Sequence, residues 1–346
     1  MHKKLIGLAA AATAAALLLA GCAGEGTGAA STPKASNAAT TPGSWSSDTL
    51  NIDYATYNPL SLIVKDQGYL EGTFGDKVKV NWVLSAGSAA ANLALKAGAL
   101  DVGSTAGSAA LLARANGAPI KAIDVYSQPN WSAILVGKNS AIKTVADLKG
   151  KTVAAQTGTD PYFFLLQALD KAKVPLSSVT IENLPHSNGK TALEGGSVDA
   201  WSGLDPLLTT SILTAGSKDI YDNPSFNSYG FLDGTESFLA KSPDIAQAVV
   251  NAYEKARAFA IKNPQQTSTI LAGVAGINPS IASNVIENRT KLDIDPVPGA
   301  TQTKVLTVIG PVLVQSGAVA NQGLVDAALK NLYDTTFVKK ADPSAK

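Results

Sequence analysis

Hydrophobic and polar positions follow two different periods along the chain, and segments of the two kinds alternate. Residues 50–54 and 78–83 switch between apolar and polar side chains, which is typical of half-buried strands. Apolar residues spaced three and four positions apart indicate helices over residues 60–67 and 89–97. Because strands and helices alternate in this way, the pattern predicts an α/β fold with mainly parallel sheets.

The same alternation continues toward the middle of the chain. Further strands are expected over residues 100–103, 119–126, 131–136, 152–154, 179–184 and 198–201. Further helices are expected over residues 109–116, 163–169 and 190–195. From Ser242 onward the pattern becomes helical, with Ser242 as a cap and Pro243 at the first helical position. We expect the strand at 131–136 to cross into a second domain.

Four loops of small residues stand directly after predicted strands. They cover residues 57–58, 85–88, 105–108 and 157–159. Ligands of open α/β sheets bind beyond the carboxyl ends of the strands. A helix that begins there adds free N–H groups and the positive end of its dipole. The loops therefore predict an anion site, with Thr159 or Asp160 capping the next helix and Pro161 at its first position.

The N-terminus combines a basic start with a short apolar stretch and the only cysteine of the chain. Lys3 and Lys4 precede the Ala/Leu-rich residues 5–20, and Cys22 follows. This resembles a bacterial lipoprotein signal peptide, so residues 1–21 are expected to be removed and Cys22 to be lipidated. Residues 22–47 are then expected to form a disordered tether, because residues 25–47 have almost no large apolar side chains.

Composition excludes several classes of function. The 346 residues carry a formal net charge of +1 and show no basic stripe, which argues against nucleic acid as a partner. With Cys22 used for lipid, His186 is the one remaining His or Cys after the signal segment, so no metal site, cofactor or catalytic centre is expected. His186 is predicted to lie in a polar loop, and the protein is predicted not to be an enzyme.

Large aromatic side chains near the loops are candidates for the walls of a small-molecule pocket. Tyr57, Trp131 and Trp201 could serve in this way, although such residues belong to the core more often than to a pocket wall. Asp205, close after Trp201, could bind an amine or cap a helix.

Several segments resemble the substrate-binding lipoproteins of ABC importers for nitrate, sulfonate and taurine. The segments that carry the resemblance are residues 98–105, 134–136, 142–154 and 195–201, the last just ahead of Asp205 and Pro206. The resemblance covers residues 50–208 well and the rest loosely. It implies a type II periplasmic-binding-protein fold with two α/β lobes joined by two hinge strands. Lobe I would comprise residues 48–133 and 235–346, and lobe II residues 134–234.

The same resemblance implies a ligand-binding set that combines the loops with the aromatic and acidic candidates. The set is Tyr57, Asn58, Gly87, Ser88, Thr105, Ala106, Gly107, Trp131, Thr157, Gly158, Thr159, Asp160, Trp201 and Asp205. Four places depart from the pattern of these proteins. Asp160 replaces a smaller uncharged residue and His186 a common Asp, while Ser108-Ala109 stands where Pro-Pro is usual and Tyr57-Asn58 where a Gln-Lys or Gln-Ser pair is usual. A carboxylate would repel an anion. Asp160 is therefore expected either to turn outward as a cap or to face a cationic or hydroxyl part of the ligand.

The function implied is that of a monomeric, extracytoplasmic lipoprotein that binds a small anionic solute and delivers it to ABC permease subunits. An aliphatic sulfonate or taurine is the first expectation for the solute. The alternatives are nitrate, a carboxylate, or a heterocycle such as a thiamine precursor or a riboflavin-like compound. A sensory lipoprotein and an enzyme similar to the pyrimidine synthases of thiamine pathways are further alternatives.

Overall fold

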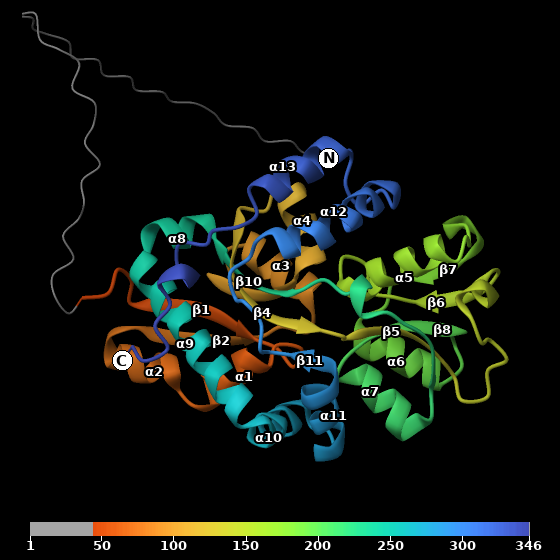
Figure 1. Ribbon diagram of the computed structural model, residues 1–346, viewed down its shortest axis with the longest axis horizontal. Coiled ribbons are helices and arrows are strands. Elements are labelled where there is room, and N and C mark those ends of the chain that lie inside the picture. The colour runs from red at the N-terminus through yellow and green to blue at the C-terminus, as the bar shows by residue number, and fades with distance from the viewer. Residues whose placement is uncertain (1–43, 346) are drawn as a thin grey trace, which may run out of the picture. The chain divides into compact units, whose positions relative to one another are not determined.

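The computed structural model describes residues 44–345, and within this range the strands form two sheets (Figure 1). The first sheet contains β1 (Thr49–Tyr54), β2 (Lys79–Leu84), β3 (Val102–Ala106), β4 (Ile120–Pro129), β10 (Gly230–Thr235) and β11 (Thr290–Lys291). The second contains β5 (Ser132–Val136), β6 (Thr152–Ala154), β7 (Thr180–Glu182), β8 (Ala200–Leu204) and β9 (Lys218–Asp222). The mixed α/β fold is therefore as predicted.

Each sheet has a parallel core to which antiparallel strands are added. The strand order is β11-β4-β10-β3-β1-β2 in the first sheet and β7-β6-β8-β5-β9 in the second. β1 runs parallel to β2 and β3, whereas β10 lies antiparallel between β3 and β4. β5 lies antiparallel between β8 and β9. The sheets are thus mixed rather than mainly parallel, because β5 and β10 run against the strands beside them.

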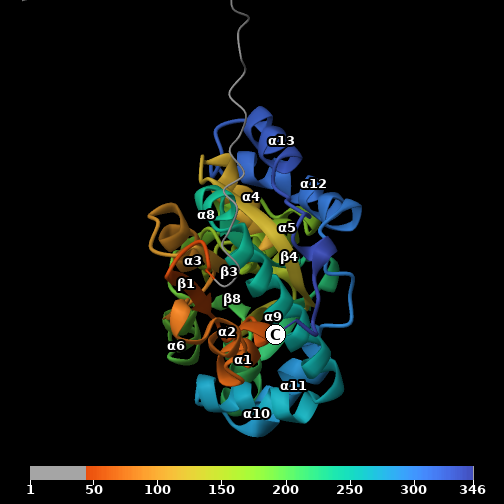
Figure 2. The ribbon, with the colours of Figure 1, turned by 90° about the vertical axis from the view of Figure 1, so that its left-hand side faces the viewer.

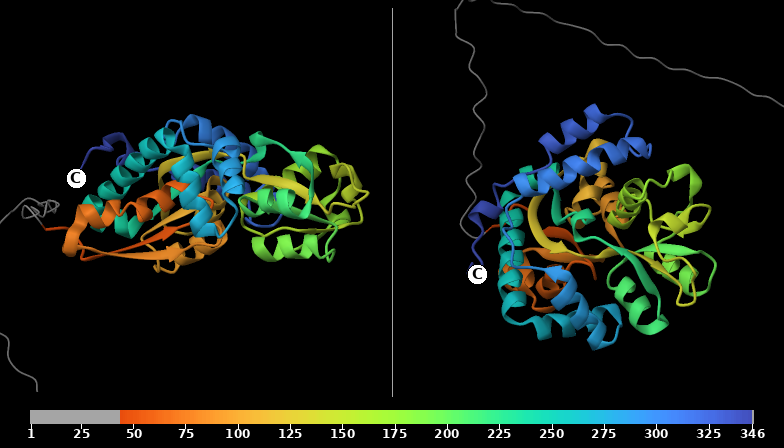
Figure 3. Two further views of the ribbon diagram at one scale, coloured as in Figure 1. Left: turned by 90° about the horizontal axis from the view of Figure 1, so that it is seen from below. Right: turned by 45° about the vertical axis from the view of Figure 1, so that its right-hand side comes forward.

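The chain passes between the two sheets twice. It leaves the first sheet after β4 and enters the second with β5, and it returns from β9 to β10. Figure 3 shows both passages, with β4 in yellow and the return toward β10 in green. These passages are the two connections that the sequence resemblance implied, and they bring β4 and β10 into one antiparallel pair.

Helices cover both faces of each sheet. Around the first sheet they are α1 (Pro59–Asp66), α2 (Tyr69–Phe74), α3 (Ser88–Lys96), α4 (Gly107–Ala115), α8 (Glu236–Lys241), α9 (Pro243–Lys262), α10 (Pro264–Ala275), α11 (Pro279–Arg289), α12 (Ala300–Gln315) and α13 (Gln322–Lys330). Around the second they are α5 (Asp160–Lys171), α6 (His186–Glu194) and α7 (Leu207–Thr210). Figure 2 shows α10 and α11 at the opposite end of the view from α12 and α13.

Four clusters of buried apolar side chains hold these layers together. On the first sheet, Ile52 packs with α1 and α9, and on the other face Phe231 packs with α4 and α12. On the second sheet, Val153 packs with α5, whereas Trp201 packs with α6 and α7. Burying one large apolar side chain stabilises a fold by roughly 1.5–3 kcal/mol, so these clusters fix which helix covers which face.

A buried ion pair attaches α9 to the strand that leads into the first passage. Arg257 Nη2 lies 3.1 Å from Asp124 Oδ1 in β4, and the guanidinium also donates to the carbonyl oxygens of Tyr126, Val125 and Leu292. Burial raises the pKa of Asp124, and the positive charge of Arg257 opposes that rise. Arg257 also pairs with Glu254 in the same helix, through Nε at 2.9 Å, whereas Asp124 depends on Arg257 for the compensation of its buried charge.

Several boundaries differ from those predicted. The signal peptide, Cys22 and most of the tether lie outside the described residues. The tether was predicted to reach residue 47, but Trp45 packs edge-on against Phe74 with ring centroids 4.8 Å apart, and Ser46 donates to Asp244. Residues 45–47 therefore belong to the folded part. Among the described residues, no helix combines the length and the apolar character that crossing a membrane requires.

Two glycines offer a matched test of the packing between β4 and β10. A Cβ on Gly230 would lie 2.3 Å from the ring of Tyr126, whereas a Cβ on Gly273 in α10 would meet open space. We expect Gly230→Ala to lower the free energy of unfolding by about 1–3 kcal/mol, because the buried ring has to move. Gly273→Ala should raise the free energy of unfolding by about 0.4–1 kcal/mol, because alanine lowers the conformational entropy of the unfolded chain. Urea denaturation measures both, and equal stabilities would contradict the described packing.

Candidate functional site

The loops predicted to bind a solute meet where the two sheets face each other. All residues of the predicted set are buried except Thr157, which is exposed, and Gly158, which is half-buried. Loops of the first sheet contact loops of the second at two places, one around Asp160 and one around Gly87. The structure therefore brings together most of the predicted residues, in direct contact across the two sheets.

Hydrogen bonds to α1 and β3 hold the loop after β1 in place. Asn58 caps α1, since its Oδ1 accepts from Leu60 N at 3.1 Å and from Ser61 N at 3.3 Å. Asn58 Nδ2 donates to Ser104 Oγ at 2.8 Å, and the Tyr57 hydroxyl donates to the Ser104 carbonyl oxygen at 2.8 Å. Burial raises the pKa of Tyr57 well above its ordinary value, so this hydroxyl stays a donor.

Asp160 is the most fully hydrogen-bonded side chain at the junction. Its Oδ1 accepts from Ser108 Oγ at 2.6 Å and from Ser228 Oγ at 2.7 Å. Its Oδ2 accepts from Ser228 N at 2.8 Å and from Trp131 Nε1 at 2.8 Å. Burial raises the pKa of Asp160, and these hydrogen bonds offset part of the rise. The expectation that Asp160 turns outward as a cap is wrong, because all these donors lie outside its own helix.

Trp131 connects Asp160 to the loop after β1. It lies between β4 and β5, in the first passage, and its ring meets the ring of Tyr57 edge-on with centroids 6.1 Å apart. Ser228 lies in the second passage, just before β10, and its Oγ accepts from Ser108 N at 3.0 Å. Both passages and the first turn of α4 therefore converge on one carboxylate.

The second contact joins the loop after β2 to the start of α6. Gly87 has φ +141°, and a Cβ there would lie 3.2 Å from His186 Cδ2 and 3.3 Å from Nε2. Only glycine combines this backbone with so close an approach. His186 N donates to Gln156 Oε1 at 3.2 Å, which ties α6 to the loop after β6.

His186 lies in a helix and not in the polar loop that was predicted. Its side chain is 3% exposed, and neither ring nitrogen has a hydrogen-bond partner within residues 44–345. Burial lowers its pKa to about 4, so the ring is neutral near pH 7. A neutral imidazole offers one donor and one acceptor. Such unpaired buried groups are what a bound ligand can satisfy.

Further residues of the predicted set lie at the start of α3, in β3 and at the start of α4. Ser88 Oγ accepts from Ala106 N at 2.9 Å, and Thr105 Oγ1 donates to Asp233 Oδ2 at 2.5 Å. A Cβ on Gly107 would lie 3.1 Å from the ring of Phe231.

Across the junction, Gly158 turns with φ +76° and faces Leu112 in α4. Thr159 is the N-cap residue of α5 but makes no side-chain cap, since its Oγ1 donates to the carbonyl oxygen of Gln156 at 2.6 Å. Thr157, next to it, remains open to solvent.

Trp201 and Asp205 make contacts that stabilise the fold. Trp201, a residue of β8, is fully buried against α6, where Gly189 makes room for its indole. Asp205 Oδ1 accepts from Thr209 N at 2.9 Å, so it caps the N-terminal turn of α7. Its Oδ2 accepts from Arg289 Nε at 2.5 Å. Of the two roles predicted for Asp205, capping is the one that the structure contains.

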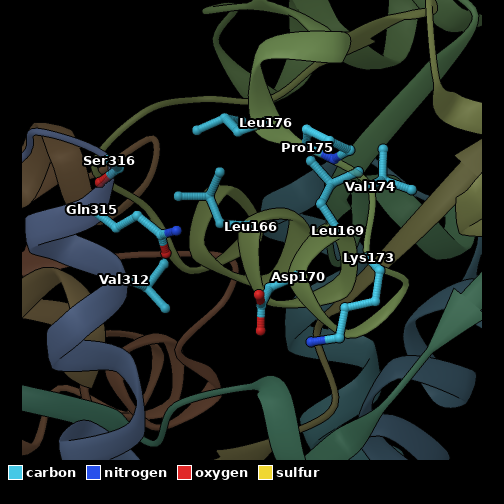
Figure 4. Close-up of a pocket in the computed structure, with 10 residues that line it drawn as sticks. All are labelled: Leu166, Leu169, Asp170, Lys173, Val174, Pro175, Leu176, Val312, Gln315 and Ser316. Atoms are coloured by element: carbon cyan, nitrogen blue, oxygen red, sulfur yellow. The ribbon is translucent and has the colours of Figure 1, made fainter.

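A separate hollow lies beside the helix that carries Asp160. It measures about 250 Å³ and is formed between α5 and the end of α12 (Figure 4). Apolar side chains such as Leu166 and Val312 line it together with Lys173 and Gln315. None of the predicted site residues lines this hollow.

The predicted set lacked several contributors to the junction: His186 and Gln156 at the contact around Gly87, and Ser108, Ser228 and Arg289 elsewhere. Ser108 stood in a recognised loop, so its hydroxyl was a visible signal. Ser228 follows no strand pattern, and it lies 68 positions from Asp160, so sequence alone gave no sign of their contact. Arg289 ends α11 and reaches Asp205 from 84 positions away.

Comparison with known proteins identifies the family of this chain. Residues 63–267 match the family described as NMT1/THI5 like, and the chain belongs to that family. An Escherichia coli (strain K12) protein provisionally named an aliphatic sulfonates-binding protein is 29% identical over 254 residues, which cover 73% of this chain and 79% of that protein.

Two solved structures share the fold. The alkanesulfonate-binding protein SsuA from Xanthomonas axonopodis pv. citri, bound to MOPS, aligns with a TM-score of 0.73 at 24% identity, over 82% of this chain and 98% of that one. The periplasmic aliphatic sulphonate binding protein SsuA from Escherichia coli aligns with a TM-score of 0.70 at 25% identity, over 84% and 93%. The predicted periplasmic-binding-protein fold is thereby confirmed. These relatives are named as binding proteins.

His186 provides a pH test of the closed junction. Because its folded pKa of about 4 lies below the ordinary value of 6.5, the unfolded chain takes up the proton first as pH falls. The stability due to neutral His186 is complete above pH 6.5 and is lost as pH falls toward 4. Between pH 7 and 5 the wild type should lose about 2 kcal/mol more unfolding free energy than His186→Gln.

Denaturant titrations of both proteins at the two pH values measure this difference. Shifts of other groups, such as the raised pKa of Asp53, occur in both proteins and cancel. Parallel pH profiles would contradict a buried neutral imidazole.

Proposed function

We propose that this chain, which belongs to the NMT1/THI5-like family, is the extracytoplasmic solute-binding component of an ABC importer. The observation that carries the proposal is the convergence of loops from two separate sheets on one buried junction. Two sheets that are joined by two passages can open and close on a small molecule. The names of the relatives, which are binding proteins, support the same function.

The proposed moving parts are the two lobes expected from the sequence. Lobe I comprises residues 48–133 and 235–346, and lobe II residues 134–234. Their boundaries fall at the passages between β4 and β5 and between β9 and β10. A solute that binds the closed form better than the open form shifts the population toward closure. Permease subunits would then recognise the closed, loaded monomer.

The proposed solute is a small organic anion, with aliphatic sulfonates and taurine as the first candidates. Relatives named for sulfonate binding support this class. The junction also offers groups that suit a small polar solute, since Gly87 and Ser88 begin α3 and His186 begins α6. Helix starts donate N–H groups to anions.

The chain purified without residues 1–22 tests the proposal. We expect saturable thermal stabilisation by at least one member of a panel of taurine and short alkanesulfonates. At one hundred times the dissociation constant, binding adds about 2.7 kcal/mol to the unfolding free energy. Thermal unfolding with increasing ligand measures the effect. Stabilisation by nitrate, a carboxylate or a heterocycle alone would overturn the sulfonate class, and no response to any of them would count against solute binding.

A matched pair of variants links the response to the junction. Gly87→Val places a side chain against His186 and Gln156, so it should weaken solute binding at least tenfold. Ala86→Val changes the exposed neighbour and should leave the affinity within about twofold, as surface substitutions do. Equal affinities of the two variants would remove this loop from the site. Circular dichroism checks that both are folded.

The proposed anchor is lipid on Cys22. Residues 1–22 have the pattern of a lipoprotein signal. One acyl chain binds a protein to a membrane only weakly and reversibly, whereas two chains anchor it stably. In a bacterial host, the wild type should incorporate labelled fatty acid and sediment with membranes. Cys22→Ser should do neither, while keeping its solute response. Labelling of the Cys22→Ser protein would overturn this assignment.

A further inference from the structure

The carboxylate of Asp160 has a complete set of hydrogen-bond donors. Each of its two oxygens accepts two hydrogen bonds, at distances between 2.6 and 2.8 Å. An ionised carboxylate has about four acceptor sites, so none is left over. The donors are hydroxyl groups of Ser108 and Ser228, the main-chain N–H of Ser228 and the indole N–H of Trp131. All four are neutral groups.

These donors are not a helix cap. A capping side chain accepts from N–H groups in the first turn of its own helix. Asp160 is the first residue of α5, yet its donors come from α4 and from both passages between the sheets. The donor set therefore exists independently of α5, held on elements that pack around the first sheet and its exits. Ser108 N also donates to Ser228 Oγ, which fixes two donors relative to each other.

We propose that these four donors form an oxyanion-binding subsite that the chain fills with its own carboxylate, so that Asp160 determines solute specificity. Neutral hydroxyl and N–H donors that converge on a planar carboxylate also suit sulfonate, sulfate or formate. While Asp160 occupies the subsite, a free anion there would meet both a filled space and a like charge. The anionic group of the solute is thereby kept out of this part of the junction.

The two halves of the proposal rest on different foundations. The existence of the subsite depends only on the described contacts of Asp160. Its role in specificity rests on the proposed solute-binding function. An experiment with free oxyanions on a variant lacking the carboxylate tests the first half even where no solute of the wild type is known.

The variant for this experiment is Asp160→Ala, in the chain without residues 1–22. We expect methanesulfonate, sulfate and formate to raise its melting temperature saturably, at constant ionic strength. Titration calorimetry should give a dissociation constant for methanesulfonate at least tenfold lower than that of the wild type. The double variant Asp160→Ala with Ser228→Ala lacks one donor and should lose most of this gain.

Each outcome of this experiment supports or rejects one half of the proposal. If Asp160→Ala is folded and responds to the three anions no more than the wild type does, the subsite does not exist. The same holds if the double variant responds equally well. If Asp160→Ala is unfolded in buffer alone, formate should restore its circular dichroism, and failure to do so would also reject the subsite. If the subsite forms but the solute preferences of wild type and variant coincide, the role in specificity is wrong while the subsite stands.

Discussion

A carboxylate that is buried between two sheets has to collect hydrogen-bond donors, because a buried charge without partners is strongly destabilising. Asp160 accepts hydrogen bonds from donors in α4 and in both passages that join the sheets. The positions of these segments therefore depend on one another. Trp131, held by Asp160, in turn packs edge-on against Tyr57, and Tyr57 donates to the Ser104 carbonyl in β3. This one carboxylate thus links α4, both passages, the loop after β1 and β3.

The parts of the fold that depend on local patterns could be predicted from the sequence. Alternation in 50–54 and the helical spacing in 60–67 agree with β1 and α1, because side-chain periodicity decides which face is buried. β10 was not predicted. It is buried on both faces and reads Gly-Phe-Leu-Asp-Gly-Thr, so it shows no alternation and carries two glycines. Its position is determined by the strands on either side, which lie far away in the sequence.

The site was predictable only in part, for related reasons. The loops after β1, β2, β3 and β6 follow from strand ends, and all of them reach the junction. The orientation of Asp160 depended on Ser228, which no local pattern reveals. His186 was predicted to lie in a polar loop, but it begins α6. Gly189 within this helix is required by packing, since the indole of Trp201 occupies the space that a side chain at 189 would need.

The two contacts across the junction differ in what they leave for a ligand. Both oxygens of Asp160 already accept two hydrogen bonds each, so an additional donor gains little from this carboxylate. Around Gly87, the imidazole nitrogens of His186 are buried without partners among residues 44–345. A ligand that supplies those partners recovers a desolvation cost that folding has already incurred. Affinity for a polar solute is therefore expected to arise near His186, whereas the charge of Asp160 selects which solutes the junction tolerates.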